Sequence, residues 1–156
     1  MDAKPKDLFG TFARIEMFTW ALLIVAILVR ETIGLSPNIF TIAGATHGFA
    51  FMGYSVTAVL VGVNQRWPLA QTALSIVLAI VPFATYPFDR YLDKRAALEG
   101  EWRIEGTNDP RDNSPFDRLF RWFIFRPVLL VLTLAVFVVS LFAFLLWLGP
   151  PGEWGN

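Results

Sequence analysis

The sequence predicts an all-α membrane protein with four transmembrane helices in an antiparallel bundle. Hydrophobic residues make up 55% of the 156 residues, and the mean hydropathy of +0.52 is well above that of an ordinary soluble protein. Charged residues make up only 17% and are clustered, which leaves long apolar runs between the clusters. A bilayer core of about 30 Å needs roughly 20 apolar residues in a helix. Four stretches meet that requirement, and they are residues 12–29, 39–63, 67–88 and 123–148.

Each predicted span ends at residues that stop a membrane helix. The connections after the first and second spans are short, so we expect the first three helices to be antiparallel neighbours. We treat the whole chain, residues 1–156, as one membrane domain. The stop signals, in chain order, are Arg30-Glu31, Asn64-Gln65-Arg66, Asp89-Arg90 and Gly149-Pro150-Pro151.

A charged loop over residues 89–122 connects the third and fourth spans. Near its end Ser114 can cap a helix, Pro115 suits the first helical position, and Asp117 faces the positive end of the helix dipole. Apolar residues then recur at helical spacing, with arginines on the opposite side. This pattern predicts an interfacial helix at the membrane surface before the fourth span. The alternative is one continuous, tilted helix with a hydrated first turn.

The distribution of lysine and arginine predicts an orientation in a bacterial plasma membrane. With four spans, both termini and the second loop share one side, which holds four of these residues, whereas the other side holds nine. Only Lys and Arg count for this rule. We therefore expect the charged loop in the cytoplasm. The four residues on the terminal side are Lys4, Lys6, Arg14 and Arg66.

Composition excludes several functional classes. The chain has no cysteine, which excludes disulfides, thiolate metal sites and iron–sulfur clusters. Its one histidine, His47, excludes a haem held by two imidazoles of this chain. The net charge is +0, so we expect no nucleic-acid partner. We expect no cofactor and no metal, and we name no catalytic residue. A membrane enzyme acting on lipid or quinone is the least favoured hypothesis.

Three ionisable residues interrupt the apolar runs, and such residues are functional candidates in a membrane. Arg14 and Glu16 lie near the start of the first span. They could form a proton or substrate relay, or they could lie at headgroup level and pair with a neighbour such as Arg66. His47 lies well inside the second span. It could act as a protonation switch, or as a neutral imidazole that bonds to another helix.

Two further features predict contacts between helices. Gly44 and Gly48 form a G-x-x-x-G pair, and Ser55 lies two turns further along the same face. Small residues of this kind allow two helices to approach closely, and the partner could be another helix or another chain. At the third exit, Asp89 and Arg90 are expected on the same side as Arg30-Glu31, where the four charges could form a structural cluster.

Several short motifs together resemble a family of small bacterial integral membrane proteins of unknown function, frequent in actinobacteria. The resemblance covers residues 10–93, and no activity comes with it. It implies that Arg14, Glu16, His47, Gly48, Tyr54, Pro82 and Asp89 occupy motif positions. The motifs are Phe12-Ala13-Arg14-Ile15-Glu16, the segment from His47 to Tyr54, Val81-Pro82-Phe83 and Phe88-Asp89-Arg90-Tyr91-Leu92.

Two functional hypotheses follow. The first is a non-catalytic accessory subunit that packs against larger membrane subunits in lipid and stabilises them, with a respiratory cytochrome assembly as the specific form suggested by analogy. The second is a small transporter that works as a homo-oligomer, because four helices rarely enclose a path. Its path would be lined by Arg14, Glu16 and His47.

Overall fold

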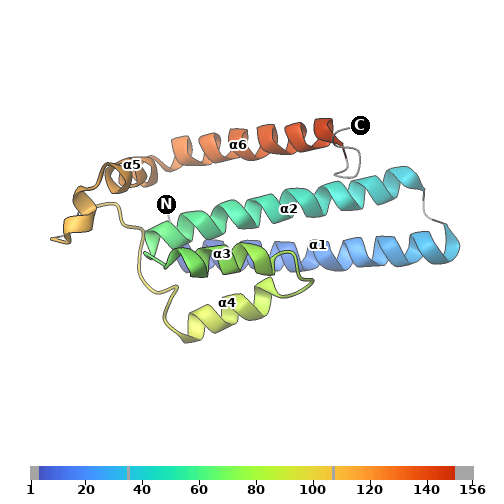
Figure 1. Ribbon diagram of the computed structural model, residues 1–156, viewed down its shortest axis with the longest axis horizontal. Helices are drawn as coiled ribbons and strands as arrows, with labels where there is room; N and C mark the ends of the chain where they lie inside the picture. The colour runs from blue at the N-terminus through green and yellow to red at the C-terminus, as the bar shows by residue number, and fades with distance from the viewer. Residues whose placement is uncertain (1–3, 35, 107, 150–156) are drawn as a thin grey trace. The chain divides into compact units, whose positions relative to one another are not determined.

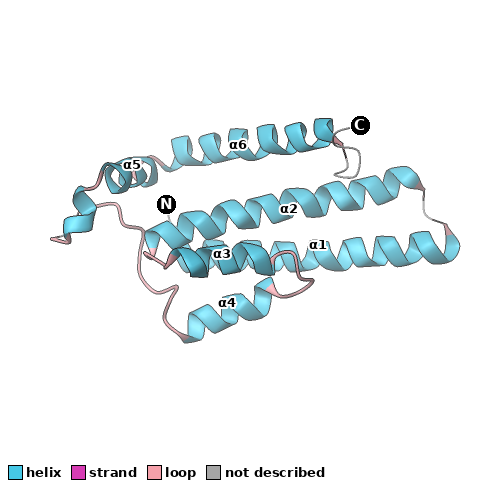
Figure 2. Ribbon diagram, in the orientation of Figure 1, coloured by secondary structure: helices cyan, strands magenta, loops and turns pink. Residues whose placement is uncertain are grey.

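A computed structural model describes residues 4–34, 36–106 and 108–149, and every regular element among them is helical (Figure 2). The described residues form two compact units. Residues 4–100 hold α1 to α4, and residues 101–149 hold η1, α5 and α6. The single membrane domain over residues 1–156 stays a prediction. The elements are α1 (Pro5–Ile33), α2 (Pro37–Asn64), α3 (Leu69–Leu78), α4 (Thr85–Lys94), the 3₁₀ turn η1 (Pro110–Asn113), α5 (Pro115–Ile124) and α6 (Pro127–Leu148).

Three helices among the described residues are long and apolar enough to cross a membrane, namely α1, α2 and α6. With 29 residues, α1 is about 43 Å long, which exceeds the hydrocarbon core of a bilayer. Each of the three helices starts with a proline in its first turn, where the missing N–H costs nothing. The apolar runs at 12–29, 39–63 and 123–148 are therefore confirmed as long helices, although α6 starts four residues later than expected.

The predicted third span, residues 67–88, is wrong, and the four-helix bundle is not confirmed. The segment holds two helices, since α3 ends at Leu78 and α4 begins at Thr85. A ten-residue helix such as α3 is only about 15 Å long, half of a bilayer core. The cause is local, because Pro82 has no N–H to continue α3 and Phe83 takes a positive φ of 64°. Pro87 is tolerated because it lies in the first turn of α4.

The break turns the chain around, so that α4 packs antiparallel to α1. Figure 1 shows α3 and α4 beside the same half of the α1–α2 pair. Lys6 forms a 2.5 Å ion pair with Asp93. One turn further along α1, a Cβ on Gly10 would lie 3.4 Å from both carboxyl oxygens of Asp89. The expected cluster of Asp89-Arg90 with Arg30-Glu31 is therefore wrong, because the charges of α4 lie at the opposite end of α1.

Close backbone approaches on α2 occur at two glycines that the sequence analysis did not single out. A Cβ on Gly53 would lie 2.7 Å from a ring carbon of Phe12 on α1. A Cβ on Gly62 would lie 2.6 Å from Oγ1 of Thr72 on α3. Glycine at these positions lets α1 and α3 pack directly on the α2 backbone.

In the C-terminal unit, α5 is a helix separate from α6, which decides between the two alternatives for this segment. The backbone N–H of Asp117 donates to the Ser114 hydroxyl at 3.1 Å, so the predicted cap is confirmed. The helix ends at Ile124, and two residues separate it from Pro127, which starts α6. Its location at a membrane surface stays a prediction.

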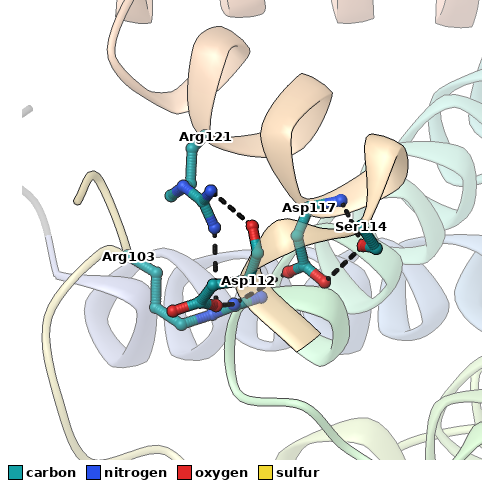
Figure 3. A network of polar contacts seen from close by, with 5 residues as sticks. All are labelled: Arg103, Asp112, Ser114, Asp117 and Arg121. Atoms are coloured by element: carbon teal, nitrogen blue, oxygen red, sulfur yellow. Dashed lines mark hydrogen bonds and ion pairs between the residues drawn. The ribbon is translucent and has the colours of Figure 1, made fainter. Parts of the chain in front are cut away.

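A polar clasp that the sequence analysis missed holds the loop before α5 in place (Figure 3). Arg103 donates to Asp117 at 2.9 Å and to Asp112 at 3.3 Å. Arg121 donates to the backbone carbonyl of Asp112 at 2.7 Å. These charge-assisted bonds connect residues on both sides of η1 and fix the start of α5.

Candidate functional site

The candidate site centres on Glu16, which is fully buried although it lies in a candidate membrane span. It is 11 residues into α1, about 17 Å from the start of the helix. Thr85 lies with its hydroxyl 2.5 Å from Oε2 of Glu16. The other oxygen, Oε1, is buried without a hydrogen-bond partner among the described residues. The role of this buried carboxyl group in a proton or substrate relay stays a prediction.

The helix break places Thr85 opposite Glu16. Thr85 is the first residue of α4, so the N-terminal end of that helix, with its positive dipole, faces the carboxyl group. The Thr85 hydroxyl also lies 3.2 Å from the carbonyl oxygen of Ala13. The indole N–H of Trp20 donates to the carbonyl of Ala79 at 3.0 Å, which ties the turn between α3 and α4 to α1.

His47 joins the same face of α1 from the α2 side. It is buried, its Nδ1 lies 3.2 Å from the hydroxyl of Thr19, and its ring centroid lies 4.3 Å from that of Trp20. The Thr19 hydroxyl donates its one proton to the carbonyl oxygen of Glu16 at 2.9 Å. The contact with His47 then needs a proton on Nδ1, which leaves Nε2 as the acceptor nitrogen of a neutral ring.

Tyr54 and Asp89 extend the site toward the start of α1. Tyr54 is fully buried, and its hydroxyl has no hydrogen-bond partner in the described part of the chain. The carboxyl groups of Glu16 and Asp89 both lie within electrostatic range of it. Asp89 is buried against Gly10. Burial raises the pKa of the Asp89 carboxyl, and the nearby Arg90 acts in the opposite direction.

Of the other predicted candidates, Arg14 and Arg90 lie outside this cluster. Arg14 is exposed and donates to Thr11 on its own helix at 3.2 Å. Arg90 is exposed and lies 4.0 Å from Asp93. The structure therefore brings together Glu16, His47, Tyr54 and Asp89, but neither arginine.

The predicted packing face on α2 has no partner that the structure identifies. A Cβ on Gly44 would meet nothing within 4 Å in the described chain. The hydroxyl of Ser55 donates to the carbonyl of Phe51 on its own helix at 2.8 Å. The role of Gly44, Gly48 and Ser55 in helix packing stays a prediction.

Sequence reasoning missed Thr19, Trp20 and Thr85, although all three contact the predicted residues. Each is compatible with a helix in lipid, so none stands out in an apolar run. The usable signal was the pair Pro82 and Pro87, since a helix broken between them must start again near Thr85.

Residues 7–94 match the model of a family described as Domain of unknown function (DUF3817). The chain belongs to the DUF3817 family. This confirms the resemblance inferred from the motifs. The match ends at Lys94, the last residue of α4, so the DUF3817 segment coincides with the four helices of the first unit.

Two relatives of this DUF3817 chain are also described as membrane proteins. "Putative membrane protein SCO5905" of Streptomyces coelicolor is 38% identical over 94 residues, which is 58% of this chain and 11% of that protein. "Uncharacterized membrane protein YdzA" of Bacillus subtilis is 34% identical over 71 residues, which is 46% of this chain and 73% of that protein. No solved structure matches the chain.

Within the DUF3817 segment the buried groups form a column of titratable side chains along α1. It runs from Asp89 and Tyr54 to Glu16 and His47, with the half-buried Asp93 at its charged end. Groups of three or more possible metal ligands do not occur in the described residues. Each of these carboxyl, phenol and imidazole groups can bind or release a proton, although no hydrogen bond joins one of them to the next in the described residues.

Proposed function

We propose that this membrane protein is a small transporter, working as a homo-oligomer, in which Glu16 and His47 take up and release a proton. The observation that carries the proposal is the complete burial of Glu16, with one carboxyl oxygen left unpartnered. An ionised carboxylate in such a position costs several kcal/mol or more. Burial therefore disfavours the ionised form, and release of a proton from Glu16 would be coupled to a change in its surroundings.

The column supports proton entry from one side only. In the other half of the helix pair, from Trp20 to Val29 on α1 and from Pro37 to Thr46 on α2, no side chain is titratable. A proton would therefore need a hydrated path through the rest of the membrane. A homo-oligomer could enclose such a path between its copies, since a single small helical bundle rarely does.

Proton flux into liposomes carrying an internal pH dye tests the proposal. We expect wild-type protein to dissipate a pH gradient and Glu16→Gln to slow this at least tenfold, because the amide cannot release a proton. Glu31→Gln is the matched control, since Glu31 is an exposed glutamate at the other end of α1. Equal flux in Glu16→Gln, His47→Gln and wild type would overturn the proposal, as would wild-type flux equal to that of empty liposomes.

A second candidate is the accessory subunit of a larger membrane complex. The observation that favours it is the open surface at Gly44, where an added Cβ would meet nothing within 4 Å in the described chain. Without a hydrophobic driving force in lipid, an uncrowded glycine face is where a partner helix can approach closely. A respiratory cytochrome assembly remains the specific form of this candidate.

Extraction in mild detergent at native expression, with identification of co-purifying chains by mass spectrometry, tests the accessory subunit. We expect larger membrane subunits in fixed ratio, and their loss in Gly44→Leu. The matched control is Ile42→Leu, which leaves the glycine face unchanged. Recovery of the chain alone, or as a homo-oligomer, would count against this candidate and in favour of transport.

A further inference from the structure

A groove between α5 and α6 lies outside the DUF3817 segment. It has a volume of about 200 Å³ and is lined by Phe116, Leu119 and Phe123 of α5 and by Leu130, Thr133 and Leu134 of α6. Thr133 is the polar exception in an otherwise apolar wall. Because α6 is a candidate membrane span, the groove opens where this helix begins, at the level expected for a membrane interface.

Of the charged residues described near the groove, two form ion pairs and two do not. Asp117 and Arg121 are engaged in the clasp with Arg103 and Asp112 (Figure 3). Arg118 and Arg126 are exposed, and neither is within ion-pair distance of an acidic side chain in the described part of the chain. Their positive charge is therefore available at the surface of α5 and at its junction with α6.

Arg126 is positioned at the entrance to α6. It immediately precedes Pro127, and its guanidinium carbon lies 4.4 Å from the ring centroid of Trp122. This contact holds the guanidinium close to the α5–α6 corner while leaving its N–H groups for another acceptor. A planar guanidinium suits a phosphate, because it can donate two parallel hydrogen bonds.

We propose that the α5–α6 groove binds an acyl chain of an anionic phospholipid, with the lipid phosphate at Arg126 and with Arg118 adding positive charge on the outer face of α5. An acyl chain fits the apolar wall because it brings no polar group that would need a hydrogen bond there. Two arginines without acidic partners favour an anionic over a zwitterionic headgroup. The inference is independent of proton transport.

Native mass spectrometry of the full chain in detergent, with added phosphatidylglycerol or phosphatidylcholine, tests the headgroup. We expect phosphatidylglycerol to be retained in preference. In the double variant Arg118→Gln/Arg126→Gln its affinity should fall about thirtyfold, given the attraction of each surface arginine to anionic lipid. Arg90→Gln is the matched control, because Arg90 is an exposed arginine on α4, and it should retain wild-type affinity.

A groove-filling variant tests the acyl chain. Thr133→Phe should reduce retention of phosphatidylglycerol, whereas Ala135→Phe should not, because Ala135 is exposed on α6 but does not line the groove. Equal retention of the two lipids, or equal retention by Thr133→Phe and Ala135→Phe, would overturn the proposal. Displacement of the lipid by millimolar inorganic phosphate would also overturn it, since the headgroup alone would then account for binding.

Discussion

The hydroxyl of Thr85 lies 2.5 Å from Oε2 of Glu16, although the two residues are 69 positions apart in the sequence. The contact exists because the chain turns back at Pro82 and starts α4 directly opposite α1. Thr85 therefore satisfies one oxygen of a fully buried carboxyl group. The stability of the α1–α4 packing and the protonation of Glu16 depend on the same bond.

Replacement of Thr85 by valine is expected to destabilise the protein by about 1–3 kcal/mol, because it leaves a buried carboxyl oxygen without its donor. Thr85→Ser should restore most of the loss. Thr32→Val is the control, since Thr32 is exposed and its hydroxyl donates to its own helix at Leu28. Thermal unfolding of the purified protein in detergent measures the difference. Equal melting temperatures for Thr85→Val and Thr32→Val would show that the contact contributes nothing.

Alanine substitutions on α2 should distinguish glycines that are in close contact with another helix from glycines that have free space around them. Gly62→Ala is expected to destabilise the fold by about 1–3 kcal/mol, because its Cβ would lie 2.6 Å from Oγ1 of the stiff side chain of Thr72 and 3.3 Å from the ring of Trp67. Gly44→Ala meets nothing within 4 Å in the described chain, and it should gain up to about 1 kcal/mol from helix propensity. Thermal unfolding again gives the comparison. A loss in Gly44→Ala as large as that in Gly62→Ala would reveal a contact at Gly44.

The buried Asp89 predicts a pH dependence of stability. Burial raises the pKa of this carboxyl in the folded protein, so the folded state binds the proton more tightly than the unfolded state does. Its contribution to stability is full below the ordinary aspartate pKa of about 4 and is lost as the pH rises through the raised value. Asp89→Asn should remove this component, and Asp7→Asn, an exposed control at the same end of α1, should not. Melting temperatures from pH 4 to 8 would contradict this if Asp89→Asn followed the wild-type curve.

The long helices could be predicted from the sequence, because an apolar run of about 20 residues rarely forms any structure other than a long helix. It was also sufficient for the start of α5, where Ser114, Pro115 and Asp117 act through neighbouring backbone groups. Glu16, His47, Tyr54 and Asp89 could be singled out because ionisable or hydroxyl-bearing side chains are rare in such runs.

The sequence could not reveal how these residues meet. The apolar run over residues 67–88 is equally compatible with one span or with two half-length helices, and the choice depends on how Pro82 and Phe83 pack rather than on hydropathy. The partners Thr19, Trp20 and Thr85 become recognisable only when the direction of α4 is known. That direction also decides which charges share a membrane face.

Because the chain turns back between α3 and α4, these helices form a hairpin and do not cross the membrane as a third span. The membrane topology expected from this hairpin differs from the topology expected from four spans. In residues 4–100, Arg30 is the single lysine or arginine at the far end of α1. The other lysines and arginines lie in the half of the bundle where α1 starts and α2 ends. We propose that this half faces the cytoplasm.

Because the chain has no native cysteine, single introduced cysteines can report the topology without background labelling. We expect Asp7→Cys and Lys94→Cys to react with a membrane-impermeant maleimide from one side, and Glu31→Cys from the other. A third complete span would place Lys94 with Glu31, so joint labelling of those two positions would rule out the hairpin. Labelling of Asp7→Cys and Lys94→Cys in intact cells, rather than only after lysis, would reverse the proposed orientation while leaving the hairpin in place.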